Sequence, residues 1–204
     1  MSLVSGLRVV VDVQHLYKTD RPNDRGAVYT LANGLKVTEA SAALLYAQSL
    51  CQYLEAQGAA VLTNDPAHGI MVGFYSQRNR AAGAWGATAY IACHVNAGLG
   101  QYAAVEYMST TVGSDLAGAI APQLKAAFPT TLSAAKLVAL SSGQRGASCI
   151  ERVPSPCAAV LVEPFFGDTP RHQHLLEAPN LKRVGEAIGL GVMEWWKARR
   201  VVIV

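Results

Sequence analysis

Three short apolar runs constrain the fold of this 204-residue chain more than any other feature: Arg8–Val13, Thr88–His94 and Ala158–Glu163. They are almost wholly apolar and do not alternate with polar residues. Such runs are typical of strands buried on both faces, as in a parallel sheet covered by helices on each side. Helical patterns lie between the strand patterns. We therefore predict an α/β fold of three layers, α/β/α, with a mostly parallel twisted sheet.

Periodicity and turn residues predict the remaining elements. Residues 16–36 and 141–157 are rich in turn formers and are predicted to be loops, the first long enough to be functional. In the first helix, an apolar face is expected from Leu44, Leu45, Leu50 and Leu54. Four helices are predicted. The first has an N-cap at Thr38 and ends at about Gln57, the second covers 75–85, the third has a cap at Ser114 and ends at about Phe128, and the last follows a cap at Asn180. The further predicted strands are Ala59–Thr63, Ala103–Ser109 and Leu137–Leu140.

Length and composition fit one domain over residues 1–204, because 51% of the residues are hydrophobic and 15% are charged. No apolar run reaches the roughly 20 residues that span a bilayer. The N-terminus lacks a charged segment followed by a long apolar one, so we expect no secretory signal and a cytoplasmic location. The net charge of +3 is mild, and no basic stripe predicts a nucleic-acid partner. We expect a monomer.

The four cysteines show no CxxC spacing. We expect small buried thiols in a reducing compartment, with a disulfide between Cys149 and Cys157 as the alternative. Three histidines are expected at the surface: His68 in a polar loop, and His172 and His174 on the approach to the last helix. In that helix Trp195 falls on the apolar stripe, whereas Trp196 is expected nearer the surface.

Polar residues stand where the buried strands end. His15 and His94 follow two of the runs, Glu163 closes the third, and Glu39 opens the helix after the first long loop. Ligands of open parallel sheets bind beyond the carboxyl ends of the strands, so these side chains are expected to converge. Taken singly, each has a structural explanation: a hydrogen-bonded histidine, an acidic group in a helix's first turn, or a salt-bridge partner.

Together the four residues have the composition of a hydrolytic zinc site. Catalytic zinc commonly takes three protein ligands and a water, and His15, Glu39 and His94 fit those positions. Glu163 fits the acid/base role, since a carboxylate that ends an apolar strand is costly to bury without a task. The same ligands would also accept other divalent metals.

The motifs around these residues resemble those of a known family. Val11-Asp12-Val13-Gln14-His15 is similar to Val-Asp-x-Gly-His, and Glu39 follows the long loop as the family's glutamate does. A third motif matches at Arg78, Ala82, Ala87, His94 and Asn96, and a fourth at Ala159–Glu163 with Phe166. Over about Arg8–Trp196 the chain resembles the zinc-dependent N-acetylmuramoyl-L-alanine amidases of the Amidase_3 type.

This resemblance implies zinc on His15, Glu39 and His94, and catalysis by Glu163. The implied reaction is hydrolysis of the amide between the lactyl group of N-acetylmuramic acid and L-alanine in peptidoglycan. Gln14 and Leu16 replace the family's usual glycines, and we expect this to put a side chain near the metal.

Three further residues are predicted along the substrate groove. Asn96 belongs to the third motif, and Glu106 resembles a family glutamate that follows the second histidine. Arg145 lies in Gln144-Arg145-Gly146, which resembles an Arg-Gly segment of the family. The alternatives are a structural pairing for Glu106 and a solvated loop charge for Arg145.

The resulting hypothesis is a phage or prophage endolysin without a separate cell-wall-binding domain, cytoplasmic until lysis and then active on the wall. A degenerate amidase that binds peptidoglycan without turnover is the alternative. A zinc carboxypeptidase or deformylating amidohydrolase of similar layout is a third interpretation. The completeness of the four site residues favours the amidase.

Overall fold

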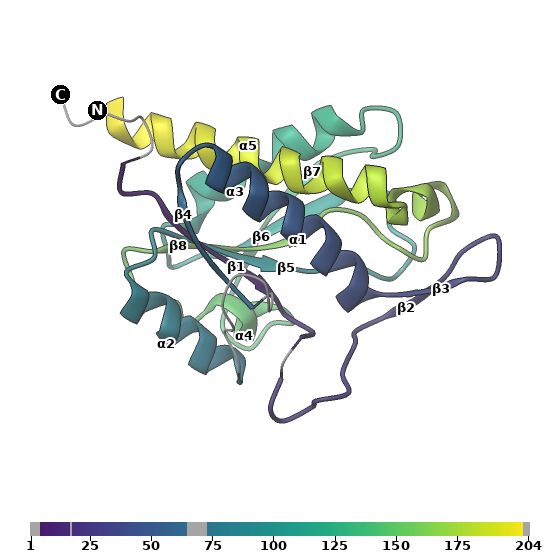
Figure 1. Ribbon diagram of the computed structural model, residues 1–204, viewed down its shortest axis with the longest axis horizontal. Helices are drawn as coiled ribbons and strands as arrows, with labels where there is room; N and C mark the ends of the chain where they lie inside the picture. Colours follow the sequence, from purple (N-terminus) through teal and green to yellow (C-terminus); the bar gives the residue numbers. More distant parts are fainter. Residues whose placement is uncertain (1–4, 17, 65–72, 202–204) are drawn as a thin grey trace.

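A six-stranded sheet forms the centre of the computed structural model, which describes residues 5–16, 18–64 and 73–201 (Figure 1). The strand order is β4-β1-β5-β8-β6-β7. The first four strands run parallel, while β6 runs antiparallel to β8 and parallel to β7. The strands are β1 (Arg8–Val13), β4 (Ala60–Thr63), β5 (Ala89–Cys93), β6 (Ala103–Met108), β7 (Ala135–Leu140) and β8 (Ala158–Glu163).

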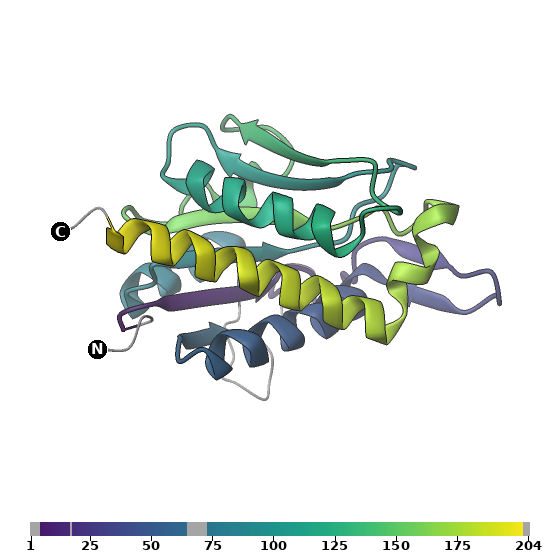
Figure 2. The same ribbon diagram turned by 90° about the horizontal axis from the view of Figure 1, so that it is seen from above.

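Helices cover both faces of this sheet, which confirms the predicted three layers and the mostly parallel sheet. One face carries α1 (Glu39–Ala56), α3 (Gly113–Ala127) and α5 (Ala178–Val201); the other carries α2 (Tyr75–Trp85) and α4 (Ala147–Ile150) (Figures 1 and 2). Every residue of β5 is buried, as a continuous apolar run predicts for a strand between two helical layers. Helices α1 and α5 approach closely, since a Cβ at Gly185 would lie 2.2 Å from the carbonyl oxygen of Tyr46.

The start of α1 is fixed by its predicted cap. The Thr38 hydroxyl accepts a hydrogen bond from the amide of Ser41 at 3.2 Å, so Glu39 is the first helical residue. The preceding segment was predicted to be loop throughout, and this is wrong in part. It contains an antiparallel hairpin of β2 (Val28–Thr30) and β3 (Lys36–Thr38), whose three-residue strands are too short to show a period of two.

Four further predictions about local structure are corrected. Ser114 and Asn180 are not caps, because α3 and α5 begin before them. The side-chain amide of Asn180 instead donates to the carbonyl of His174 in the 3-10 helix η1 (Pro170–Leu176). Leu45 is 46% exposed, since the alanines of α1 and Tyr46 occupy the inner face. The 141–157 loop contains the single turn of α4.

The predicted burial of the four thiols is confirmed, and all four are free, so Cys149 and Cys157 form no disulfide. The prediction for His172 is wrong: its side chain is fully buried, and Nδ1 accepts a hydrogen bond from the amide of Phe166 at 3.3 Å. His174 is exposed as expected. Trp195 is buried and Trp196 is half-buried. His68 lies outside the described residues. Among those residues, no helix combines the length and apolarity that crossing a membrane requires.

Candidate active site

Three of the predicted residues converge beyond the carboxyl ends of the central strands. His15 follows β1, His94 follows β5, and Glu39 opens α1. One ligand atom from each lies within 4.8 Å of the other two. Oε1 of Glu39 is 2.8 Å from Nδ1 of His94 and 3.3 Å from Nε2 of His15. The structure therefore brings together all three predicted metal ligands.

The backbone explains this convergence. Strands β1 and β5 are adjacent and in register, with Val13 beside Cys93, so the histidines that follow them leave the same edge of the sheet. Their rings lie edge to face, with centroids 5.1 Å apart. The carboxylate of Glu39 is fixed by the amide of Ala27, which donates to Oε2 at 3.0 Å. The amide of Val95 donates to Oε1 at 3.2 Å.

The charged forms of Glu39 and His15 stabilise each other. Burial alone would raise the pKa of Glu39, but hydrogen bonds from His15 and His94 and their charges hold it well below its usual range. Burial alone would lower the pKa of His15, but hydrogen bonds and charge from Glu39, together with Asp24, raise it. An ionised Glu39 thus stabilises the protonated form of His15.

The cluster also fits a metal ion. In a tetrahedral zinc site with bonds of about 2.0–2.2 Å, ligand atoms lie roughly 3.3–3.6 Å apart. The separation of 3.3 Å between His15 and Glu39 matches this distance, while the 2.8 Å between His94 and Glu39 is that of a hydrogen bond and would lengthen slightly around an ion. Two imidazole nitrogens and one carboxylate oxygen are a common donor set for catalytic zinc, and other divalent metals accept it too.

Glu163 stands beside this cluster at the end of β8, the neighbour of β5. Its Oε2 is buried and has no hydrogen-bond partner among the described residues. Burial raises the pKa of Glu163 well above its usual range. The charges of Glu39 and Glu106 raise this pKa further, and the charge of Arg145 lowers it. A carboxyl group in this environment can hold a proton near neutral pH.

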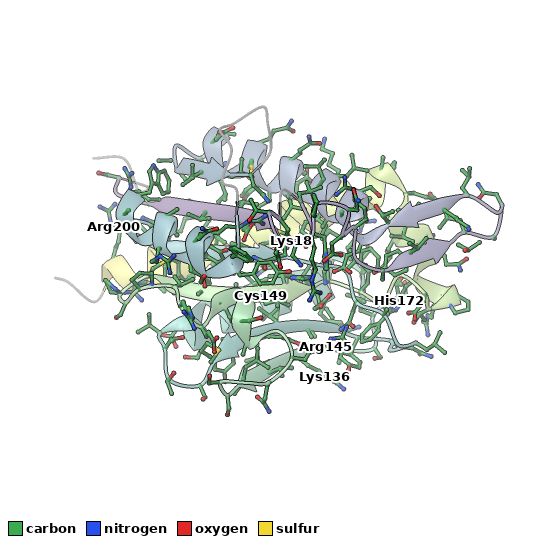
Figure 3. The ribbon with its side chains drawn as sticks, turned by 90° about the horizontal axis from the view of Figure 1, so that it is seen from below. Lys18, Lys136, Arg145, Cys149, His172 and Arg200 are labelled. Atoms are coloured by element: carbon green, nitrogen blue, oxygen red, sulfur yellow. The ribbon has the colours of Figure 1, made fainter. Side chains whose placement is uncertain are left out.

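A pocket of about 800 Å³ contains all four groups, together with the three predicted groove residues Asn96, Glu106 and Arg145. Glu106 lies opposite Leu161 on β8, diagonal to Glu163 on the same face of the sheet. Arg145 is exposed, and its side chain has no hydrogen bond or ion pair among the described residues. Figure 3 views this side of the molecule and labels Lys18, Cys149 and Arg145, which all line the pocket.

The sequence did not predict the two groups that contact the ring nitrogen of each histidine that faces away from Glu39. Asp24 Oδ1 lies 3.0 Å from Nδ1 of His15, and Cys149 Sγ lies 3.8 Å from Nε2 of His94. Asp24 is one of several polar residues in the 16–36 loop, and nothing in its spacing marks it. Gln14 does not line the pocket, contrary to expectation: its side chain turns away and is buried against Asp12 and Tyr90.

The sequence matches the Amidase_3 family, described as N-acetylmuramoyl-L-alanine amidase, over residues 9–194. The chain belongs to this family. Membership supports amidase activity on peptidoglycan, as the sequence motifs implied. No curated protein matches the chain as a relative.

Several solved structures share the fold of this chain. AmiC2, an N-acetylmuramoyl-L-alanine amidase of Nostoc punctiforme, is 20% identical with a TM-score of 0.74, covering 93% of this chain and 96% of its own. Cwp6 from Clostridium difficile is 21% identical with a TM-score of 0.73; the match covers 93% of this chain but only 29% of Cwp6. The catalytic domain of CD27L, an endolysin targeting Clostridia difficile, is 19% identical with a TM-score of 0.59, covering 92% and 97%.

Proposed function

We propose that this protein is a zinc-dependent amidase that hydrolyses the bond between the lactyl group of N-acetylmuramic acid and L-alanine in peptidoglycan. One observation carries the proposal: His15, Glu39 and His94 meet in a pocket where Glu163 presents a buried, unpartnered carboxyl oxygen. Family membership supplies the substrate class.

The three clustered residues would hold the metal through the atoms that face one another, Nε2 of His15, Oε1 of Glu39 and Nδ1 of His94. When bound, zinc supplies a Lewis acid that polarises the scissile carbonyl and lowers the pKa of a water molecule. Because Glu39 is held by the amides of Ala27 and Val95, its carboxylate is oriented before any metal arrives.

Glu163 would carry the proton. Its carboxylate accepts a proton from the attacking water and then donates it to the nitrogen of the leaving L-alanine. The raised pKa of Glu163 suits this transfer, because the protonated form is then readily reached near neutral pH. Asn96, Glu106 and Arg145 line the same pocket and would contact the substrate there.

We further propose that the enzyme acts as a phage or prophage lysin, held in the cytoplasm until lysis and then acting on the wall. The shared fold with the catalytic domain of an endolysin is consistent with this role. A direct test is expression in a host cell together with a membrane-permeabilising holin. Lysis should then require both proteins and an intact Glu163.

The test of the activity is release of amino groups from purified peptidoglycan. Wild type should expose N-terminal L-alanine, chelation should abolish the release, and added zinc should restore it. Glu163→Gln should reduce the rate by at least about 100-fold, as loss of a general base does, and should still bind zinc. Glu186→Gln, on the outer surface of α5, is the matched control and should retain full activity.

The degenerate binding module predicts a different result. Such a protein would bind zinc and sediment with peptidoglycan, yet wild type and Glu163→Gln would release no amino groups from any wall type. Release of free D-amino acids in place of N-terminal L-alanine would instead identify a carboxypeptidase.

A further inference from the structure

The imidazole of His15 lies between two carboxylates. Nε2 faces Oε1 of Glu39 at 3.3 Å, and Nδ1 faces Oδ1 of Asp24 at 3.0 Å. A neutral imidazole carries one N–H, and an ionised carboxylate can only accept a hydrogen bond. If Asp24 takes the hydrogen on Nδ1, then Nε2 keeps its lone pair, directed at Glu39 and the metal cluster.

Asp24 is itself fixed at both oxygens. The ammonium of Lys18 lies 2.7 Å from Oδ2, and the amide of Gly26 donates to Oδ1 at 2.9 Å. With both oxygens held, Asp24 is an oriented acceptor that faces Nδ1 of His15.

Lys18 is unusual for a lysine in a surface loop. Only 8% of it is exposed, and its ammonium lies 4.8 Å from the centre of the Tyr75 ring at the start of α2. Burying a lysine is costly unless its charge is paired. Its position between Asp24 and Tyr75 links the loop that carries Asp24 to a helix of the layer beneath the pocket.

His94 presents the other ring nitrogen to Glu39 than His15 does. His94 presents Nδ1 to Glu39 and turns Nε2 toward Cys149, which is the opposite arrangement. The two histidines thus offer different nitrogens to one carboxylate oxygen. A different group faces the other nitrogen of each ring: Asp24 for His15 and Cys149 for His94.

We propose that Asp24, held by Lys18, is a positioning residue that fixes His15 as the Nδ1–H tautomer with Nε2 aimed at the metal. This inference rests on the proposed metal site. In known metal sites, removal of such an outer partner weakens metal binding by about 10–100-fold. Here the partner comes from the 18–24 part of the long loop.

The first measurement is the tautomer itself, read by long-range ¹H–¹⁵N correlation on the ¹⁵N-labelled, metal-free full chain at alkaline pH, where the ring is neutral. Wild-type His15 should be protonated at Nδ1. Asp24→Ala should lose this preference, and Asp24→Asn, whose amide oxygen still accepts, should keep it. Lys18→Met should give a mixture of the two tautomers, because Asp24 is then held only by the amide of Gly26.

The second measurement is zinc affinity, by competition with a chromophoric chelator. Asp24→Ala should bind zinc about 10–100-fold more weakly, with Lys18→Met and Asp24→Asn between it and wild type. Asp20→Ala is the matched control, since Asp20 lines the same pocket and contacts Arg21 rather than His15; its zinc affinity should not change.

An unchanged tautomer and unchanged affinity in Asp24→Ala would overturn the proposal. Circular dichroism will show whether Asp24→Ala folds. If it does not, Lys18→Met takes its place in the test. A wild-type tautomer and wild-type zinc affinity in Lys18→Met would then contradict the proposed role of Asp24 and Lys18. If wild type binds no zinc, the proposed function fails, while the tautomer measurement still decides whether Asp24 orients His15.

Discussion

A Cβ atom at Gly26 would lie 2.4 Å from Oε2 of Glu39. Gly26 also has a positive φ of 69°, where an L side chain costs roughly 1–2 kcal/mol. We therefore expect Gly26→Ala to displace the Glu39 carboxylate and to lower zinc affinity by at least about tenfold, as loss of a ligand's support does. Chelator competition measures the change.

Gly34 provides the control for backbone strain. It has a φ of 81° in the turn between β2 and β3, and a Cβ there would meet nothing within 4 Å. Gly34→Ala should lower the free energy of unfolding by about 1–2 kcal/mol and leave zinc affinity unchanged. Equal losses of affinity in the two variants would mean that the contact with Glu39 has no effect.

The acid limb of the pH–activity profile should move in opposite directions in two variants. Glu163 acts as a base when ionised, so kcat/KM falls as the pH drops through its pKa. Arg145 lowers that pKa and Glu106 raises it. Arg145→Met should therefore shift the limb to higher pH and Glu106→Gln to lower pH. A shift of both in the same direction would exclude Glu163 as the group that titrates.

The buried ion pair of Asp12 and Arg78 should be essential for stability. Arg78 Nη1 lies 2.8 Å from Oδ1 of Asp12, and both side chains are fully buried. Arg78→Ala leaves an unpaired buried carboxylate, so the free energy of unfolding in urea should fall by about 3–5 kcal/mol. Arg80→Ala, exposed on the same helix, should change it by no more than about 0.5 kcal/mol.

Metal binding should stabilise the folded chain. Zinc at 100 times its dissociation constant contributes about 2.7 kcal/mol, which corresponds to a rise in Tm of about 5–10 °C for a chain of this size. Glu39→Gln, which removes the charged oxygen between the two histidines, should abolish most of the rise. An equal rise in that variant would place the zinc elsewhere.

The predicted strands and site residues share a common physical basis. A continuous apolar run shows that a strand is central, and central strands place their following residues at one edge of the sheet. His15, His94 and Glu163 were therefore predictable from position. Glu39 was predictable because Thr38 is a good cap and the residue after it must begin the helix.

The residues that were missed depend on contacts that leave no local pattern. Asp24 reaches His15 only because of the path of an irregular loop, and Cys149 reaches His94 from a single helical turn. His172 was expected in solvent because Arg171 and Gln173 flank it, yet it is buried against the backbone of Phe166. Such contacts are set by tertiary packing, which hydrophobic periodicity does not encode.

The order of strands in the sheet has a consequence for how the protein would lose activity. Strands β1, β5 and β8, which carry His15, His94 and Glu163, each have a neighbour on both sides. Interior strands commonly exchange their amide hydrogens only through global opening, whereas loops open locally at little free-energy cost. Heat or denaturant should therefore separate these three groups only when the whole molecule opens, so inactivation and unfolding would be a single cooperative event.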